Sequence, residues 1–354
     1  MYSFLNDYSE CTHEKILENI SQNLRKQNVG YGLDPHCEHA RKCIKKYLDR
    51  EDADIHFLIA GTPSNALAVA SILRPFEAVI SCDSGHINVH ETGAIEATGH
   101  KVLSRPHVNG KLTCEAIQSI LDEHTDEHMV KPKMVYISQT TEYGSIYTLS
   151  ELKKLWNFTR AHDLYLFVDG ARLGSALASS YNDVTLKDLA HYTDMFYIGG
   201  TKNGALMGEA MIILNDDLKK DFRFIMKNQG NLLAKGFLLG MQFETLFTDD
   251  LFFELGRHAN QMATRMMEAL KKKGIKFYVE PQSNQLFPWI PVKKIDDMAE
   301  KFLFSHMNIK DGRQMIRLVT SWATSEESVQ AFENYMENSP TRSEERRVGK
   351  ECRS

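Results

Sequence analysis

The sequence predicts an α/β protein with a mostly parallel central sheet flanked by helices, followed by a small α+β domain. Between residues 45 and 249, short apolar runs rich in β-branched and aromatic residues alternate with amphipathic stretches. This alternation is typical of parallel sheets, whose strands are joined by helices. After residue 250 the order is strand, strand, helix, strand, helix. The 354 residues are enough for one large and one smaller domain.

We expect an N-terminal segment over residues 1–44, with a helix at 12–27, and a large domain over residues 45–249. The strands of the large domain are expected at 55–59, 78–81, 101–103, 134–138, 164–168, 194–198 and 210–214. Helices are expected at 37–48, 65–73, 89–98, 114–124 and 150–162. Ligands of such sheets bind beyond the carboxyl ends of the strands, so the loops that follow the strands are expected to carry the chemistry.

The small α+β domain is expected over residues 250–341. A helical pattern over residues 233–273 is interrupted near Asp249 and Asp250, which marks the domain boundary. Strands are expected at 276–279, 286–290 and 315–319, and helices at 295–304 and 325–336. Residues 342–354 show no apolar period and resemble the translation of a sequencing adapter. We expect them to be a non-native tail and exclude them from the fold.

The composition argues against several classes of protein. The chain is 42% hydrophobic and 25% charged, with a net charge of −5 and no long basic stripe, so we expect no nucleic-acid partner. No apolar run approaches the ~18 residues that a membrane span needs, and the first residues lack the features of a signal peptide. The six cysteines show no Cys-x-x-Cys spacing. We therefore expect a cytoplasmic protein with reduced thiols and no metal site.

Lys202 lies in the glycine-rich stretch 199–204, directly after the strand expected at 194–198. Glycine allows positive φ and close approach of the backbone to a ligand. A lysine in such a loop can form a Schiff base if its surroundings lower its pKa. The alternative interpretation is a surface turn with a solvated lysine.

Three other strand ends carry polar residues. Gly61 and Thr62 precede a helix and could bind a phosphate, although ordinary helix capping is the alternative. Asp169 ends a strand, and a buried acid there needs a partner, such as a protonated ring nitrogen. The alternative is a capping Asp169 beside a surface Arg172. His86 could lie flat against an aromatic ligand or be an ordinary surface residue. A phosphate loop, an acid and a lysine after separate strands describe a pyridoxal phosphate site.

With these motifs, the chain resembles the low-specificity threonine aldolase / β-eliminating lyase family of fold-type I pyridoxal phosphate-dependent enzymes. The resemblance covers residues 4 to about 335. It rests on the segments 31–35 (Tyr-Gly-Leu-Asp-Pro), 61–65 (Gly-Thr-Pro-Ser-Asn), 86 with 91–93 (His, Glu-Thr-Gly), 169–172 (Asp-Gly-Ala-Arg), 201–204 (Thr-Lys-Asn-Gly) and 316–320 (Ile-Arg-Leu-Val-Thr).

The resemblance implies a role for each of these residues. Lys202 would bind the cofactor covalently, Asp169 would pair with its ring nitrogen, and His86 would stack on the ring. The phosphate would be held by Gly61, Thr62 and Thr201. The carboxylate of the amino-acid substrate would be bound by Arg172 and Arg317, since guanidinium groups bind carboxylates in a bidentate manner.

The sequence departs from the family pattern at two positions. Glu142, in the stretch 139–144, stands where family aldolases have a histidine that handles the proton of the substrate hydroxyl. Asn6 stands where the family has a serine that contributes to substrate binding. Glu142 could act as a base if burial raises its pKa, and Tyr31 is the other candidate for this role.

The sequence therefore predicts a pyridoxal phosphate-dependent lyase that cleaves a small β-hydroxy amino acid into glycine and an aldehyde. The alternatives are a β-eliminating lyase or an aminotransferase with the same cofactor, or a protein that keeps the fold without turnover. A nucleotide-binding protein is disfavoured, because no Gly-x-Gly-x-x-Gly follows the first strand. The resemblance also implies a homodimer or homotetramer with active sites at its interfaces.

Overall fold

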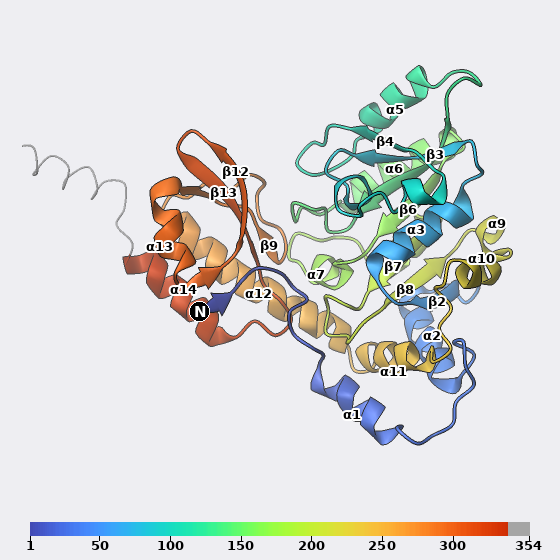
Figure 1. Ribbon diagram of the computed structural model, residues 1–354, viewed down its shortest axis with the longest axis horizontal. Coiled ribbons are helices and arrows are strands. Elements are labelled where there is room, and N and C mark those ends of the chain that lie inside the picture. Colours follow the sequence, from blue (N-terminus) through green and yellow to red (C-terminus); the bar gives the residue numbers. More distant parts are fainter. Residues whose placement is uncertain (339–354) are drawn as a thin grey trace, which may run out of the picture.

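The computed structural model describes residues 1–338 as a large and a small domain (Figure 1). The large domain contains a seven-stranded sheet in the order β2-β8-β7-β6-β5-β3-β4. β8 is antiparallel to both neighbours, and the other pairs are parallel. The strands are β2 (Asp54–Leu58), β3 (Glu77–Cys82), β4 (Val102–Arg105), β5 (Lys131–Ser138), β6 (Tyr165–Asp169), β7 (Met195–Gly199) and β8 (Glu209–Ile213). The predicted fold class is confirmed.

Two hydrophobic cores lie on opposite faces of this sheet, because successive side chains of a strand point to opposite sides. In β5, Val135 and Ile137 belong to one core, and Met134 and Tyr136 belong to the other. The helices of the large domain and of the preceding segment are α1 (Glu14–Gln22), α2 (Pro35–Leu48), α3 (Gly61–Ile72), α5 (Cys114–Glu123), α6 (Leu149–Ala161), α7 (Leu173–Leu177), α8 (Leu186–His191), α9 (Asp216–Lys219), α10 (Phe222–Asn228) and α11 (Phe237–Leu246). α3 and α10 contribute to the second core, and α2, α5, α6, α8 and α11 to the first.

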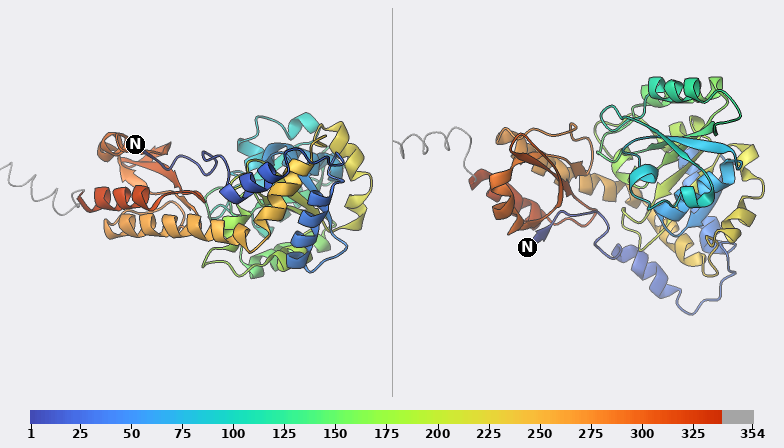
Figure 2. Two further views of the ribbon diagram at one scale, coloured as in Figure 1. Left: turned by 90° about the horizontal axis from the view of Figure 1, so that it is seen from below. Right: turned by 45° about the horizontal axis from the view of Figure 1, so that its top comes forward.

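The small domain packs an antiparallel sheet against helices around a third core. Its elements are α12 (Leu251–Lys272), β9 (Gln285–Leu286), β10 (Trp289–Pro291), α13 (Ile295–Ala299), β11 (Phe302–Leu303), β12 (Ser305–Lys310), β13 (Arg313–Val319) and α14 (Glu326–Asn338). The start of the chain, β1 (Tyr2–Ser3), pairs in parallel with β11. Figure 2 shows α12 running from the small domain to the large one. Both ends of the described chain, β1 and α14, therefore lie in the small domain.

Four predicted elements differ from the structure, and one of them is the strand expected at 286–290, which is divided into β9 and β10. The helix expected at 89–98 is replaced by α4 (His86–Val89), a loop and a 3₁₀ turn at Glu96–Thr98, because Thr92 and Gly93 have positive φ angles of 50° and 74°. The helix expected at 295–304 ends at Ala299, and β12 was missed. The strand expected at 276–279 is reduced to one bridge between Phe277 and Pro288.

The predicted interruption near residues 249 and 250 is confirmed. Asp249 and Asp250 have φ angles of 52° and 58°, and they separate α11 from α12. None of the helices within residues 1–338 is both long enough and apolar enough to span a bilayer. The predicted non-native tail, and the last residues of the predicted small domain, lie outside the described residues.

Candidate active site

Asp169 ends β6 and is almost completely buried. Its Oδ1 accepts hydrogen bonds from the Tyr197 hydroxyl at 2.5 Å and from a backbone N–H at 2.9 Å. Its Oδ2 accepts from the Tyr136 hydroxyl at 2.7 Å and from Asn65 Nδ2 at 3.0 Å. Burial alone would raise the pKa of this carboxyl, but the charge of His86 and the tyrosine hydrogen bonds lower it. Asp169 is therefore an anion held by four donors.

Lys202 lies in the turn that follows β7, the neighbour of β6 in the sheet. The two strands approach closely, since a Cβ on Gly170 would stand 1.8 Å from the carbonyl oxygen of Tyr197. Burial and the charge of Arg172 lower the pKa of Lys202, while Asp7 and Asp169 act in the opposite direction. A lowered pKa increases the neutral, nucleophilic fraction of the amine. The side chain is thus not an ordinary solvated lysine.

The N-terminus of α3 lies beside the same network. The helix begins at Gly61, and a Cβ there would stand 3.3 Å from the Tyr197 hydroxyl that donates to Asp169. The N-cap residue, Ala60, provides no side-chain cap. Its first N–H groups, which include that of Thr62, lie at the positive end of the helix dipole. This arrangement suits an anion such as a phosphate.

Thr201 makes contacts that the sequence did not predict. Its hydroxyl donates to Glu209 Oε1 at 2.8 Å and accepts from the N–H of Gly208 at 3.0 Å. Glu209 Oε2 accepts from the N–H of Gly200 at 3.0 Å. Burial raises the pKa of Glu209 to about 7. The single hydroxyl hydrogen of Thr201 is therefore used within the protein.

Two carboxylates hold His86 at the start of α4. Its backbone N–H donates to Glu142 Oε1 at 2.8 Å, and its ring Nδ1 lies 2.8 Å from Glu91 Oε1. The Ser138 hydroxyl donates to the same oxygen of Glu142 at 2.6 Å. Burial raises the pKa of Glu142 above its ordinary value, and the hydrogen bond from Ser138 limits the rise. A carboxyl group with a raised pKa is suited to act as a base, which is the role considered for Glu142 from the sequence.

The two arginines expected to bind the substrate carboxylate have different partners. Arg172 donates through Nε and Nη2 to the two oxygens of the buried Asp7, at 2.7 and 3.0 Å. Asp7 also accepts from Asn284 Nδ2 at 2.9 Å. Arg317, on β13, donates weakly to the carbonyl of Leu5 at 3.3 Å and forms no ion pair within residues 1–338. Its buried Nε has no hydrogen-bond partner in the same range. Arg317 is the arginine with the greater capacity for an added anion.

Comparison with known proteins agrees with this geometry. The family model of the β-eliminating lyases matches residues 9–292. The chain belongs to the β-eliminating lyase family. It is 30% identical to the low specificity L-threonine aldolase of Pseudomonas sp. (strain NCIMB 10558), over 84% of this chain and 86% of that protein. It is 50% identical to the solved threonine aldolase of Leishmania major, with a TM-score of 0.94 over 95% of this chain and 99% of that chain.

The same fold occurs in more distant solved structures. The histidinol-phosphate aminotransferase of Clostridium acetobutylicum is 15% identical, with a TM-score of 0.71 over 96% of this chain and 100% of that chain. This likeness concerns the fold alone. Membership of the β-eliminating lyase family confirms the predicted resemblance, fold type I, a pyridoxal phosphate-dependent lyase of the threonine aldolase type, and pyridoxal phosphate as the cofactor. The anionic Asp169, the amine of Lys202 and the N-terminus of α3 fit that cofactor.

Two of the predicted site residues, Tyr31 and Asn6, make no contact with Asp169 within the described residues. The exposed Tyr31 packs under Lys227, with Nζ 4.7 Å from its ring, and its carbonyl accepts from Arg223. Within the described residues, no hydrogen bond or ring contact joins Tyr31 to Glu142. Asn6 Oδ1 accepts from the N–H of Tyr8 and from the Ser9 hydroxyl, both at 2.9 Å, so its side chain stabilises a turn beside Asp7.

Four residues that contact the predicted site residues were not assigned a role from the sequence: Asp7, Asn65, Glu91 and Glu209. Asn65 and Glu91 belong to the motifs that carry the resemblance, and Asp7 follows Asn6, so their positions were noticed without a role. Glu209, at the start of β8, had no motif around it. A buried acid at the edge of an apolar strand was the available signal, because such an acid needs a partner.

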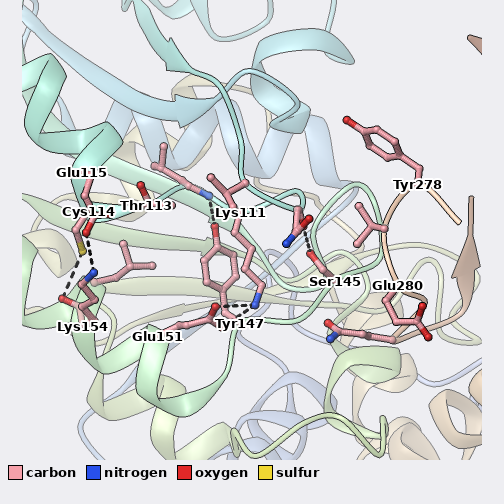
Figure 3. Close-up of a pocket in the computed structure, with 16 residues that line it drawn as sticks. Lys111, Thr113, Cys114, Glu115, Ser145, Tyr147, Glu151, Lys154, Tyr278 and Glu280 are labelled. Carbon is pink, nitrogen blue, oxygen red and sulfur yellow. Dashed lines mark hydrogen bonds and ion pairs between the residues drawn. The ribbon is translucent and has the colours of Figure 1, made fainter. Parts of the chain in front are cut away.

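A cavity of about 390 Å³ lies elsewhere in the molecule (Figure 3). It is lined by the start of α5, part of α6 and the segment around Tyr278. Its lysines are paired with acids: Lys111 with Glu151 at 2.6 Å, and Lys154 with Glu115 at 2.9 Å. None of the predicted site residues lines this cavity.

Proposed function

We propose that this protein cleaves a small β-hydroxy amino acid, such as threonine, into glycine and an aldehyde, with pyridoxal phosphate as cofactor. One observation carries the proposal: Lys202 and Asp169 follow neighbouring strands as an amine of lowered pKa and a buried anion. The similarity to the Leishmania major threonine aldolase supports the same reaction.

In this proposal, Lys202 would hold the cofactor through its amine, and Asp169 would supply the anion that keeps the ring nitrogen of the cofactor protonated. When bound, pyridoxal phosphate withdraws electrons from the Cα atom of an amino acid and so weakens the bonds to that carbon. The N–H groups of Gly61 and Thr62 hold the phosphate. We assign them this role ahead of the Thr201 hydroxyl, because that hydroxyl is already donated to a carboxylate.

Arg317 binds the substrate carboxylate, because it keeps unused donors. Arg172 adds its remaining N–H groups in an orientation set by its two hydrogen bonds to Asp7. Fixing the carboxylate would determine which bond at Cα breaks. His86 would stack on the cofactor ring, and Asn6 would contribute to substrate binding. Glu142 accepts the proton of the β-hydroxyl group, for which a raised pKa is suited.

The test is aldehyde release from threonine and from allo-threonine by the purified enzyme with cofactor bound. We expect glycine and acetaldehyde from at least one of them. Ammonia with a keto acid would instead identify β-elimination, and conversion of the cofactor to its amine form would identify transamination. Absence of every product, with the cofactor bound, would indicate a protein without turnover.

We also propose a homodimer or homotetramer whose active sites lie at subunit interfaces. Exposed apolar side chains gather in α1 and the loop after it: Leu17, Leu24, Val29, Tyr31 and Leu33. Exposed apolar patches of this kind mark protein contacts. In such an assembly, Tyr31 would serve the site of the neighbouring subunit. Light scattering of the purified protein should give at least twice the mass of one chain, and a monomer would contradict the proposal.

The free cysteines support a cytoplasmic location, which we propose as well. Among the described residues, Cys11, Cys37, Cys43, Cys82 and Cys114 form no disulfide. Free thiols of this kind are usual in reducing compartments. Fluorescence microscopy of the tagged protein in its own cells would test this, and a signal confined to an organelle would contradict it.

A further inference from the structure

Glu91 is a buried carboxylate that none of the roles above uses. Its side chain is 0% exposed, and it lies five residues after His86. Its Oε1 is 2.8 Å from His86 Nδ1 and 2.7 Å from Asn65 Nδ2. Its Oε2 is buried and has no hydrogen-bond partner within residues 1–338. Burying a carboxylate costs free energy, which hydrogen bonds to Oε1 offset only in part. The burial of Glu91 therefore lowers the free energy of unfolding.

The hydrogen-bond pattern assigns the proton on His86. Asn65 Nδ2 is shared between Glu91 Oε1 and Asp169 Oδ2, at 2.7 and 3.0 Å. An amide nitrogen only donates, so Glu91 Oε1 is an acceptor. His86 Nδ1, which contacts the same oxygen, must then carry a hydrogen. When the ring of His86 is neutral it has a single N–H group, so Nε2 is then an acceptor.

The same contacts fix the orientation of the ring. Glu142 holds the backbone N–H of His86, and Glu91 holds the side chain. Asn65 Nδ2 donates to both Glu91 and Asp169, so His86 is linked to Asp169 through Glu91 and Asn65. A displacement of Glu91 would therefore reach both the ring of His86 and the carboxylate of Asp169.

We propose that Glu91 is a positioning residue, which holds the imidazole of His86 in one orientation and in the tautomer with hydrogen on Nδ1. Nε2 is thereby kept as a hydrogen-bond acceptor in the site. This inference rests on the proposed function, because it assigns a partner to a histidine of that site. The tautomer itself is a property of the protein that can be measured independently of turnover.

The test compares Glu91→Gln with Glu91→Met. Both side chains have nearly the length of glutamate, but only glutamine keeps an oxygen that can accept from Nδ1 and from Asn65. The exposed Glu96 provides a control, Glu96→Gln, from the same segment. Holoenzyme with ¹⁵N-labelled histidine is examined by NMR at a pH where the ring of His86 is neutral, with assignment through His86→Asn. The shifts of the two ring nitrogens show which one carries the hydrogen.

We expect the Nδ1–H tautomer in wild type, Glu91→Gln and Glu96→Gln, and its loss in Glu91→Met. We also expect kcat to fall by roughly 10- to 100-fold in Glu91→Met with little change in KM, by analogy with the partners that orient metal-binding histidines. Glu91→Gln should retain most of this activity. A merely structural role would lower thermal stability in both variants without separating their tautomers.

A wild-type His86 with its hydrogen on Nε2 would overturn the inference, and this result does not depend on whether Glu91→Met folds. Equal tautomers and equal kcat in Glu91→Met and Glu91→Gln would overturn it too. Failure of the wild-type enzyme to release aldehyde would count against the proposed function instead, and the NMR result would still decide the role of Glu91.

Discussion

The end of β6 and the loop after β5 each place a carboxyl group in the site, and the pKa values of the two groups shift in opposite directions. Asp169 accepts four hydrogen bonds on its two oxygens, and its pKa is lowered although the side chain is buried. Glu142 accepts two, both on Oε1, and burial raises its pKa. The strands are neighbours, so the difference comes from the charge of His86 near Asp169 and from the larger number of donors around Asp169. The end of β6 therefore keeps an anion, and the loop after β5 keeps a group that can exchange a proton.

The largest effect is expected from Asp169→Asn, which removes the charge and keeps the size. The two tyrosine hydroxyls and the backbone N–H that donate to Asp169 would then face a neutral amide. The ring nitrogen of the cofactor would lose its anionic partner. We expect kcat/KM to fall by about 10²–10³-fold, the range for removal of a preorganised electrostatic partner. Aldehyde release measures this, with circular dichroism as the control for folding. A loss below tenfold would place the essential anion elsewhere.

Glu142→Gln tests the other side of the comparison. Glutamine keeps an oxygen for Ser138 and for the N–H of His86, so the loop should hold its structure. We expect kcat to fall by about 100-fold, at the lower end for general acid–base catalysis. A base works in its ionised form, so wild-type activity should decrease as the pH falls through the raised pKa of Glu142. The variant should lose this limb of the pH profile. An unchanged profile would assign the limb to another group.

Tyr197→Phe removes one donor from Asp169 and makes its surroundings more like those of Glu142. Hydrogen bonds to charged groups contribute about 1.5–3 kcal/mol, so the free energy of unfolding should decrease by this amount at pH 7. The folded pKa of Asp169 is lowered, so this stabilisation is present above the ordinary value of 3.8 and is lost as the pH falls through the folded pKa. Denaturant unfolding at pH 7 and at about pH 2, well below the ordinary value, should show a smaller deficit at the lower pH. A deficit that does not depend on pH would indicate lost packing only.

The smallest effect is expected from Ser138→Ala, which removes a donor from Glu142. This hydrogen bond lowers the pKa of Glu142, so its loss should raise that pKa further and move the acidic limb of the activity profile to higher pH. The free energy of unfolding should fall by about 1 kcal/mol. Ser150→Ala, on the surface, is the control. A shift of the acidic limb to lower pH would contradict the conclusion that hydrogen-bond donors lower the pKa of these carboxyl groups.

Local patterns predicted most of the large domain. The alternation of apolar runs and amphipathic helices corresponds to β2 through β8, and the paired aspartates correctly marked the break before α12. Local patterns did not predict strands whose hydrogen-bonded partner is distant in the sequence. Phe302 and Leu303 continue an apolar helical pattern, yet they form β11 because the first residues of the chain, 300 positions away, lie beside them as β1. No local window contains that partner.

The same limit applies to the site. The sequence pointed to Lys202, Asp169, Gly61 and His86 as candidates, because each lies at or just after the end of a strand and parallel strands end at one edge of a sheet. The pairing of Arg172 with Asp7 could not be, since those residues are 165 positions apart and come together only in the fold. Glu209 escaped for a similar reason: it reaches Thr201 across the turn between two antiparallel strands.

The sequence by itself determined the fold class, the cofactor and the lysine that is proposed to bind it, since these depend on periodicity and on residue types at strand ends. The tertiary structure decided the charge of each group. Ionisation depends on burial and on the donors within hydrogen-bonding distance, and those donors come from distant segments. The pKa of Lys202 is lowered by its burial and by the charge of Arg172, and the pKa of Asp169 is lowered by the charge of His86 and by hydrogen bonds from Tyr197 and Tyr136.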